Sequence, residues 1–588
     1  MTRRQFAISL GTIAAASMIC RLGYVGWQAA HDPAFAHPAL DGGLYVEWAR
    51  ALRSGAGNPA GAFYLAPLFP HVLAGFLAAF GESWRLLYAL QQAMVVAAGI
   101  ALACAVVARI GEAAALFAGA IALLYHPAAF FASRPIGEPI ALLLATLGIF
   151  FFTRSWVASA AIAGLAFGLA TLARPNLLLI AVGLCLMEIA GRRWGRALAL
   201  ASALALTLAP VAARNYAASG HPVLVSSNGG ITLYHGNGPG ALGIFTPAEG
   251  FSGTVSHQQE EATLLARART GQPFDAVDAD RWWGRQALLT RIGDPLGTLL
   301  LIARRAALTI DGYEHGLDDA PALDANPWRR AFPIPLPVVL GLAAAGLLAL
   351  GFAGTGGSAS WIPIAAGAAT PVAFYVSCRY RLPMVWFLCV PAGAAVASLM
   401  AAIRSRTFRG RPVRAAAGGL IVALASALVP SGSLARSEES MAHANLASAF
   451  AETRDFPRAE AEARKAIADD PTSVMGRYNL GVILVAVGRS AEAETMYREA
   501  LARDPSHAES AGNLAKLLIE RGAAEDAVPV LQRALASRPG DAACWTNLVV
   551  AFLARGDGTR ARGAVADGER AGVRFAPELL SAVRDGGR

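Results

Sequence analysis

The sequence predicts an all-α protein, in which a polytopic membrane helix bundle of about eleven spans precedes an α-solenoid. The first observation behind this prediction is composition. Of the 588 residues, 55% are hydrophobic and only 15% are charged, and the mean hydropathy is +0.45. Soluble domains carry about 25% charged residues, so much of this chain is expected in lipid. The second observation is a 34-residue repeat near the C-terminus.

Apolar runs of about 15–25 residues, close to the length that spans a membrane, set the predicted number of spans. The first begins at TRRQF, and we interpret it as a retained span rather than a cleaved signal because many spans follow. The runs lie near 6–29, 84–108, 113–132, 137–153, 156–173, 176–190, 197–213, 333–353, 359–377, 383–402 and 415–430.

Arginines at the ends of these runs predict the topology, because cytoplasmic loops are enriched in positive charge. They are Arg3, Arg4, Arg109, Arg154 and the clusters at 191–196 and 404–414. Residues 30–83 and 214–332 then form periplasmic loops, and an odd number of spans places the C-terminal domain outside too. We expect a multi-pass protein of a bacterial inner membrane, with its long loops and its repeats facing the periplasm.

Charge is divided unevenly along the chain. The formal net charge is +9, yet the part from Glu438 onward holds 19 basic and 22 acidic residues. The positive charge therefore belongs to the membrane part, and no basic cluster predicts a nucleic-acid partner. The six cysteines form no CxxC or Cys/His cluster, which argues against a zinc site or a disulfide framework.

The C-terminal repeat predicts a tetratricopeptide solenoid of helix–turn–helix units. Its markers recur every 34 residues, as asparagines at Asn445, Asn479, Asn513 and Asn547 and prolines at Pro471, Pro505 and Pro539. The predicted domains are thus a membrane domain over 1–430, a linker over 431–439 and a repeat domain over 440–588. Such a solenoid is expected to bind a protein, either a substrate or an assembly partner, and a role in stability or dimerisation is an open alternative.

Charged residues at the outer ends of the predicted spans are candidates for a functional site, because charges near lipid are costly unless they are paired or facing water. In the first loop, a helix starting near Asp41 would place Tyr45 on the same face. Beyond this loop, the outward-facing candidates are Arg134, Glu138, Arg174, Arg214, Arg379 and Arg381. Snorkelling anchors are the alternative reading for any one of them.

Five stretches resemble the membrane glycosyltransferases of the GT-C fold, in particular the family-39-like bacterial proteins related to protein O-mannosyltransferases and aminoarabinose transferases. The stretches are LDGGLYVEWARAL (40–52), YLAPLFPHVLAGFLAAFG (64–81), SRPIGEPIALLL (133–144), LARPNLLL (172–179) and RYRLP (379–383). The resemblance covers residues 1 to about 400. It implies transfer of a sugar from a polyprenyl-phosphate carrier to an acceptor outside the membrane.

The resemblance also implies roles for individual residues. Asp41 matches the aspartate that serves as catalytic base in the first outside loop of the family. The leaving group is a lipid phosphate, and arginine forks suit phosphate oxygens. Arg379 and Arg381 are therefore expected to bind the donor phosphate, with Arg134 next. Glu138, Tyr45, Arg174 and Arg214 are supporting candidates.

Two departures from the family pattern keep alternatives open. Gly42 follows Asp41 where relatives often have a second acid, so a divalent cation such as Mg²⁺ or Mn²⁺, held by Asp41 and Glu138, is an open alternative to metal-free chemistry. Ala66 stands where the aminoarabinose branch has a lysine, which argues against that sugar.

In the glycine-rich stretch 226–243, turns are expected, and His235 and Asn237 are guesses for ligand contact.

Two other functions are compatible with this sequence. A membrane-anchored tetratricopeptide scaffold would explain the repeat, but an anchor needs only one span. A transporter of lipid-linked sugar would be expected to hold its charges near the middle of the membrane, whereas here they cluster at one face.

Overall fold

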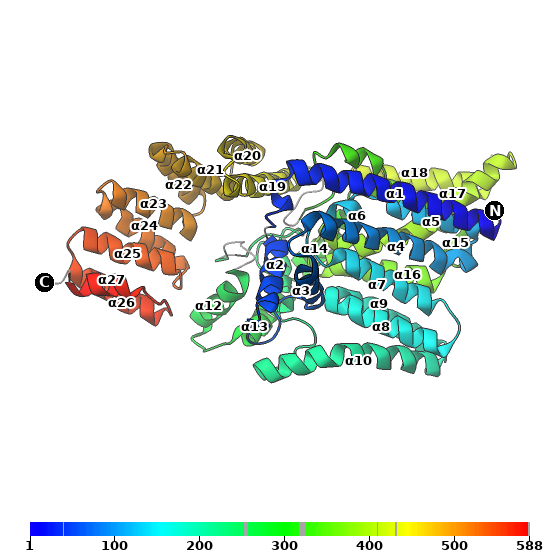
Figure 1. The fold of residues 1–588 in the computed structure, drawn as a ribbon, viewed down its shortest axis with the longest axis horizontal. Helices are drawn as coiled ribbons and strands as arrows, with labels where there is room; N and C mark the ends of the chain where they lie inside the picture. Colours follow the sequence, from blue (N-terminus) through cyan, green and yellow to red (C-terminus); the bar gives the residue numbers. More distant parts are fainter. Residues whose placement is uncertain are drawn as a thin grey trace. The chain divides into compact units, whose positions relative to one another are not determined.

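A computed structural model describes residues 1–38, 40–248, 250–251, 257–316, 324–407, 410–429 and 432–585. Within these ranges the regular structure is helical, apart from two isolated β-bridges. The chain divides into two compact units, residues 1–246 with 280–432 and residues 247–279 with 433–588. The predicted all-α fold class is confirmed at this level (Figure 1).

The first unit contains the bundle, in which every predicted apolar run forms a helix. Its long helices run side by side (Figure 1). They are α1 (Arg3–His31), α4 (Trp84–Ile110), α5 (Glu112–Leu123), α7 (Glu138–Phe152), α8 (Val157–Ala173), α9 (Leu178–Ala190), α10 (Trp194–Ser219), α15 (Leu336–Gly354), α16 (Ser358–Ala373), α17 (Cys378–Arg404) and α18 (Arg411–Ala427). The segments that connect these helices along the chain contain α2 (Leu40–Arg53), α3 (Leu68–Phe80), α6 (His126–Phe131), α11 (Gly229–Asn237), α13 (Ala276–Gly293) and α14 (Pro295–Thr309).

Five of these helices are long and apolar enough to cross a membrane by themselves, namely α1, α4, α10, α15 and α17. This number, which refers to the described residues, is smaller than the eleven spans expected from hydropathy. The other six runs form helices of 12–17 residues, shorter than the usual spanning length. The run at 113–132 is the clearest case, since it is divided into α5 (Glu112–Leu123) and α6 (His126–Phe131).

Helix α17 forms the centre of the bundle. Val385, Trp386, Cys389 and Val390 on this helix are fully buried, and the Trp386 indole donates to the Thr146 hydroxyl of α7 at 3.0 Å. Small residues allow close approach elsewhere, as is common between membrane helices. At Gly164 of α8, an added Cβ would lie 2.3 Å from the Leu200 carbonyl oxygen of α10.

The second unit has the repeat architecture that the 34-residue period predicts. Its helices are α12 (Gln258–Thr270), α19 (Gly432–Glu452), α20 (Phe456–Asp469), α21 (Val474–Ala486), α22 (Ser490–Arg503), α23 (Ala508–Glu520), α24 (Ala524–Ser537), α25 (Ala542–Ala554), α26 (Gly558–Arg570) and α27 (Pro577–Asp585). The alanines at the repeat period, such as Ala459 and Ala493, are fully buried. The Asn479 amide donates to the Ala444 carbonyl of the preceding repeat at 2.7 Å.

Residues 432–439, most of the predicted linker 431–439, begin α19, since SLARSEES contains no residue that breaks a helix, and the boundary between the two compact units falls within this stretch. One expectation for the long loop is wrong. Residues 229–237, expected to be turns, form α11. Its glycines serve close packing instead, since a Cβ on Gly236 would lie 2.0 Å from the Phe374 carbonyl oxygen. Pro430, Ser431 and residues 586–588 lie outside the described residues.

The close approach of α8 and α10 gives a test of the bundle. Gly164→Ala is expected to destabilise the protein by about 1–3 kcal/mol, because the methyl group forces the helices apart. The thermal unfolding midpoint of the purified, detergent-solubilised chain measures this. Gly75→Ala in α3 is the matched control, since a Cβ there meets nothing within 4 Å. Equal midpoints for both variants would contradict the packing described.

Candidate functional site

Four helix ends meet at one end of the bundle and bring together the acids and arginines of the candidate site. Asp41 lies in the first turn of α2, Glu138 begins α7, Arg174 caps the C-terminus of α8, and Arg379 is the second residue of α17. Segments far apart in the sequence thereby supply one cluster, which we call the acid–arginine cluster: Asp41, Glu138, Arg174 and Arg379.

Arg379 joins the two acids of the cluster. Its Nη1 donates to Asp41 Oδ2 at 2.9 Å, and its Nε donates to Glu138 Oε1 at 2.7 Å. The Arg174 guanidinium donates to the same Glu138 oxygen. Two carboxylates and two guanidiniums therefore share one network of charge-assisted hydrogen bonds, and their formal charges cancel.

The members of the cluster differ in their access to solvent. The side chains of Glu138 and Arg379 are 4% and 6% exposed, whereas that of Asp41 is 19% exposed. The second oxygen of Glu138, Oε2, is buried and makes no hydrogen bond within the described part of the chain. Asp41 is thus the acid of the pair that a ligand reaches more easily.

Tyr45 lies one turn after Asp41 on α2, as the helical spacing predicts. It is 3% exposed, and its ring meets Phe69 of α3 edge-on with centroids 5.5 Å apart. Burial raises the pKa of the Tyr45 hydroxyl above its ordinary value. A phenol that stays protonated supports the cluster by packing rather than as a base.

The backbone before Asp41 is strained. Leu40 has φ 57°, in the left-handed region that costs a non-glycine residue about 1–2 kcal/mol. Such conformations persist where the surrounding structure holds them, and they cluster at functional sites. The strain therefore agrees with a functional position for the first turn of α2.

A narrow cleft borders the cluster. Glu138, Arg174 and Arg379 form its polar side, together with Asn176 and Tyr380. Apolar residues of α7 and α17 form the other side, and they are Ala141, Leu142, Ala145, Leu382 and Pro383. The cleft has a volume of about 20 Å³, enough for one water molecule, so a larger ligand enters only if the side chains move.

Comparison with known proteins identifies the repeat and nothing further. Residues 478–542 and 518–583 each match a tetratricopeptide repeat family model. These matches confirm the predicted C-terminal repeats. No curated protein matches the chain.

Several solved structures resemble part of the chain at low identity. YrrB, a tetratricopeptide protein with an unusual peptide-binding site, is 20% identical and covers 25% of this chain and 86% of its own, with a TM-score of 0.21. PilF of Pseudomonas aeruginosa is 18% identical and covers 33% of this chain and 87% of its own, with a TM-score of 0.22. The APC/C hetero-tetramer Cut9–Hcn1 is 12% identical and covers 88% of this chain and 98% of its own, with a TM-score of 0.25. With TM-scores this low, these likenesses carry no argument about this chain.

Arg381 occupies a different environment from Arg379. It is fully buried, and its guanidinium donates to the carbonyls of Leu308, Asp311 and Tyr313 at 2.6–3.2 Å. It also pairs with Glu314 at 2.9 Å. Two residues along a helix correspond to a rotation of about 200°, so Arg379 and Arg381 face opposite sides of α17. Arg381 holds the 308–314 segment in place and is not available to a phosphate in this arrangement.

Arg134 and Arg214 also lie outside the acid–arginine cluster. Arg134 pairs with Asp32 at 2.9 Å, and its guanidinium lies 5.0 Å from the centroid of the Phe130 ring. Arg214 donates to the carbonyls of Pro59 and Gly61, each at 2.6 Å, and so fixes the end of the first loop. Both arginines have structural contacts that account for their positions at the end of the bundle.

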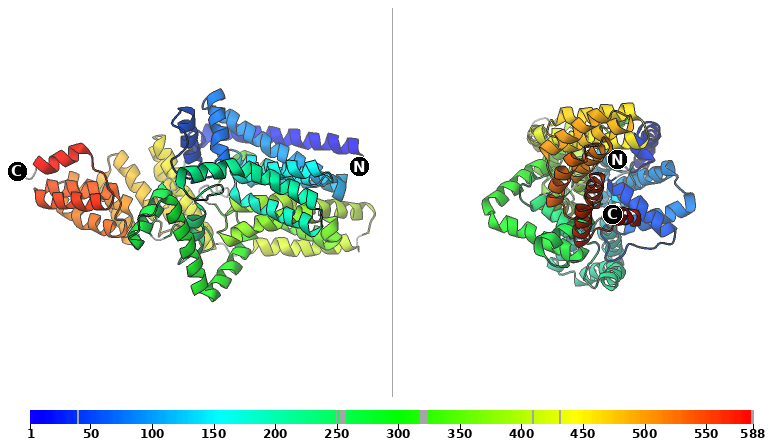
Figure 2. Two further views of the ribbon diagram at one scale, coloured as in Figure 1. Left: turned by 90° about the horizontal axis from the view of Figure 1, so that it is seen from below. Right: turned by 90° about the vertical axis from the view of Figure 1, so that its left-hand side faces the viewer.

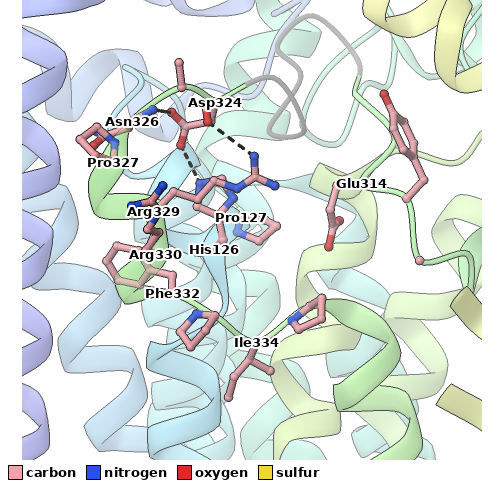
Figure 3. Close-up of a pocket in the computed structure, with 15 residues that line it drawn as sticks. His126, Pro127, Glu314, Asp324, Asn326, Pro327, Arg329, Arg330, Phe332 and Ile334 are labelled. Atoms are coloured by element: carbon pink, nitrogen blue, oxygen red, sulfur yellow. Dashed lines mark hydrogen bonds and ion pairs between the residues drawn. The ribbon is translucent and has the colours of Figure 1, made fainter. Parts of the chain in front are cut away.

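A second polar feature was not predicted from the sequence. A cavity of about 570 Å³ lies among α6, the 312–314 segment and residues 324–335. Figure 3 shows Glu314 across this cavity from His126 and Arg329. Hydrogen bonds from His126 and Tyr24 outweigh burial and lower the pKa of Asp324. The volume of this cavity is within the range of small-molecule sites. Glu314 and Asp324 lie in a long loop without a repeat or motif, so no pattern singled them out.

His235 and Asn237, guessed as ligand contacts, are structural residues of α11. The Asn237 side chain donates to the Ala373 carbonyl at 2.9 Å. His235 is 3% exposed and packs against Phe245. Burial lowers the pKa of the His235 imidazole to about 4.

On the other side of α11, burial raises the pKa of Asp280 to about 6, and this carboxylate accepts from the Ile231 amide at 2.8 Å.

The lowered pKa of His235 predicts a pH dependence. The His235 imidazole binds its proton near pH 6.5 in the unfolded chain and near pH 4 in the folded chain. The free energy of unfolding therefore falls by up to about 3 kcal/mol as the pH is lowered through this window. The raised pKa of Asp280 acts in the opposite sense there, because the folded state binds its proton more tightly. The difference between wild type and His235→Asn therefore isolates the histidine.

Thermal midpoints at pH 7 and pH 4.5 measure this effect. The wild-type midpoint is expected to fall more than that of His235→Asn between these values. His257→Gln, at an exposed histidine, is the control and should follow the wild type. Parallel behaviour of wild type and His235→Asn would show that His235 does not titrate in the folded state as described.

Proposed function

We propose that this protein is an integral membrane glycosyltransferase of the GT-C type. It would transfer a sugar from a polyprenyl-phosphate donor to a protein, lipid or glycan acceptor on the periplasmic face of a bacterial inner membrane. The observation that carries the proposal is the Arg379 guanidinium bonded to both Asp41 and Glu138 at one end of an apolar helical bundle. The family resemblance of these same segments supports it.

The arginines of the cluster suit the leaving group. When the bond between the anomeric carbon and the phosphate oxygen breaks, the carrier departs as polyprenyl phosphate with one more negative charge. Arg379 and Arg174 are the guanidiniums beside the cleft, and a guanidinium binds phosphate oxygens through paired hydrogen bonds. In this proposal Arg379 binds the donor phosphate and Arg174 compensates Glu138.

Asp41 suits the general base. An acceptor hydroxyl attacks the anomeric carbon from the side opposite the phosphate, so the configuration inverts, and its proton passes to a carboxylate. Asp41 is more exposed than Glu138 and has one contact with Arg379 rather than contacts with two arginines. A donor phosphate that takes over Arg379 releases Asp41 for this step. Glu138 remains in place as the residue that positions both arginines.

The cluster does not fit a divalent cation in this arrangement. Mg²⁺ and Ca²⁺ require about six or more oxygen ligands, mainly carboxylates, carbonyls and water. Asp41 and Glu138 are the two acids available, and the Arg379 guanidinium lies between them where a bridging ion would have to be. The proposed chemistry therefore includes no metal.

The bundle supports a membrane location, with five helices that meet the requirements for spanning alone. Eleven spans remain part of the proposal, because all six shorter helices lie in the same unit and four of them, α5, α7, α8 and α9, are apolar helices. The tetratricopeptide repeats favour a second candidate function, a membrane-anchored scaffold for a protein partner. In the enzyme, the same repeats would bind the acceptor or an assembly partner.

Asp41→Asn tests the base and separates the two functions. The variant is expected to lose about 10²–10⁴-fold in transfer, because the amide cannot accept the proton. Mass spectrometry of envelope glycans and glycoproteins, with and without the protein, first identifies the transferred sugar. The variant is then compared with wild type at equal membrane abundance. Full transfer by Asp41→Asn would sink the assignment, and a scaffold would be insensitive to this change.

Arg379 and Arg381 give a matched pair for the phosphate role. Arg379→Gln is expected to lower kcat/KM for the donor by about 10–100-fold, the value of a lost hydrogen bond to a charged group, with little change in the KM for the acceptor. Arg381→Gln is expected to lower the thermal midpoint without this loss in donor kcat/KM, since it removes the cationic partner of Glu314 and lies outside the acid–arginine cluster. Donor titrations in proteoliposomes measure the first effect. Unchanged donor dependence in Arg379→Gln would remove this residue from the phosphate site.

A further inference from the structure

The two helices α13 and α14 form a hairpin whose tip exposes an unusual amount of apolar surface. Large apolar side chains flank the turn at Gly293–Pro295, and all are 42–73% exposed: Leu288, Leu289, Ile292, Leu296, Leu299, Leu300 and Ile302. They form a stripe on each helix with spacings of three and four residues. Soluble surfaces rarely group so many large apolar side chains, and such a group marks an interaction site.

The hairpin is a rigid element that is firmly attached at its base. On α14, Leu301 and Leu308 are buried, and the Arg305 guanidinium donates to Asn237 Oδ1 at 3.0 Å and to the Val372 carbonyl at 3.1 Å. At the tip, the Asp294 carboxylate caps α14 by accepting from the Gly297 amide at 2.9 Å. The exposed stripe is therefore held outward by packing on the opposite face.

The hairpin projects sideways from the bundle. In Figure 2 it is the green pair of helices that extends across the direction of the long helices, in both views. It leaves the bundle at the end where α2 and α3 lie (Figure 1). If the long helices cross a membrane, α13 runs along the membrane surface at this end, which is the orientation of an interfacial helix.

The charges beside the tip indicate which surface it meets. Arg285 and Arg304 are exposed on the hairpin, and Arg281 lies nearer its base, where its guanidinium donates to the Pro222 carbonyl at 3.4 Å. Asp294, the cap of α14, is the exposed acid at the tip, whereas Asp278 near the start of α13 is half-buried and Asp280 is largely buried. Basic residues beside an apolar stripe bind anionic lipid headgroups while the stripe enters the acyl boundary. Pairing with a second copy through the same surface would bring like charges together.

We propose that the tip of the α13–α14 hairpin inserts into the outer leaflet of the membrane and binds anionic phospholipid. The occupant of the apolar stripe is thus a lipid surface of phosphatidylglycerol type. This inference rests on the membrane location in the proposed function, but not on sugar transfer. It gives the hairpin the role of fixing the height of the α2–α17 end of the bundle relative to the lipid surface.

Photocrosslinking in nanodiscs of phosphatidylethanolamine and phosphatidylglycerol tests the proposal with the full chain. Leu299→benzoylphenylalanine is expected to yield phospholipid adducts detectable by mass spectrometry. The same substitution at Leu206 on α10, which is 73% exposed, reports the membrane location of the bundle. At Lys516 on α23, in the second unit, no lipid adduct is expected.

The outcomes separate the two proposals. Lipid adducts at Leu206 without adducts at Leu299 overturn the hairpin proposal and leave the membrane bundle intact. An absence of lipid adducts at both positions overturns the membrane location itself. A protein adduct at Leu299, with a second copy or another chain, also overturns the lipid assignment.

A charge variant tests the headgroup. In Arg285→Gln/Arg304→Gln, the ratio of phosphatidylglycerol to phosphatidylethanolamine adducts at residue 299 is expected to fall about fivefold for each arginine removed. Arg458→Gln/Arg464→Gln is the matched control, since it removes two exposed arginines of the second unit. A ratio unchanged in the hairpin variant would overturn the preference for anionic lipid.

Discussion

The bond of the Arg379 guanidinium to Asp41 and Glu138 is the interaction on which the arrangement of this end of the bundle depends. It joins the first loop, α7 and α17, and through Glu138 it includes the end of α8. Removing one partner of a buried ion pair costs about 3–5 kcal/mol, because the remaining charge is left without compensation. The polar groups therefore define one position for α2, which hydrophobic packing alone would leave free to slide.

The phase of α17 divides its two arginines between separate tasks. Because the helix begins at Cys378, Arg379 and Arg381 are already on opposite faces in its first turn. One face meets the acids of the cluster, and the other organises three carbonyl groups and Glu314 beside the larger cavity. The same short motif thus supplies a residue accessible from the cleft and a residue that holds the fold.

Much of this organisation follows from local sequence, and the part that does not has an identifiable cause. The 34-residue period is sufficient for the repeats. Charges at the ends of apolar runs select Asp41, Glu138, Arg174 and Arg379, which the structure brings together, but the same criterion also selects Arg134, Arg214 and Arg381, which lie elsewhere. The partners of Arg134 and Arg381 were missed, because Asp32 and Glu314 are distant in sequence and carry no motif. Placing the start of the last long span at 383 rather than 378 concealed the opposite phases of the two arginines.

Glycine was the other source of error. In 229–237, glycines were interpreted as turn formers, whereas Gly230 and Gly236 allow α11 to approach the carbonyl oxygens of Asp280 and Phe374. A glycine needed for close approach is indistinguishable from a turn glycine until its neighbour is known. That neighbour lies 50 or more residues away along the chain in both cases, so only the assembled structure reveals the reason.

The neutrality of the acid–arginine cluster has a consequence for the proposed chemistry. A donor phosphate adds negative charge to a set of four groups whose charges already cancel, and the more exposed acid is the one that can yield its arginine. Once Arg379 turns to the phosphate, Asp41 faces negative charge that increases as the carbon–oxygen bond breaks. A carboxylate beside growing negative charge holds a proton more strongly, so the base would become stronger as the acceptor hydroxyl loses its proton. Arg379 would in this way couple departure of the phosphate to activation of the acceptor.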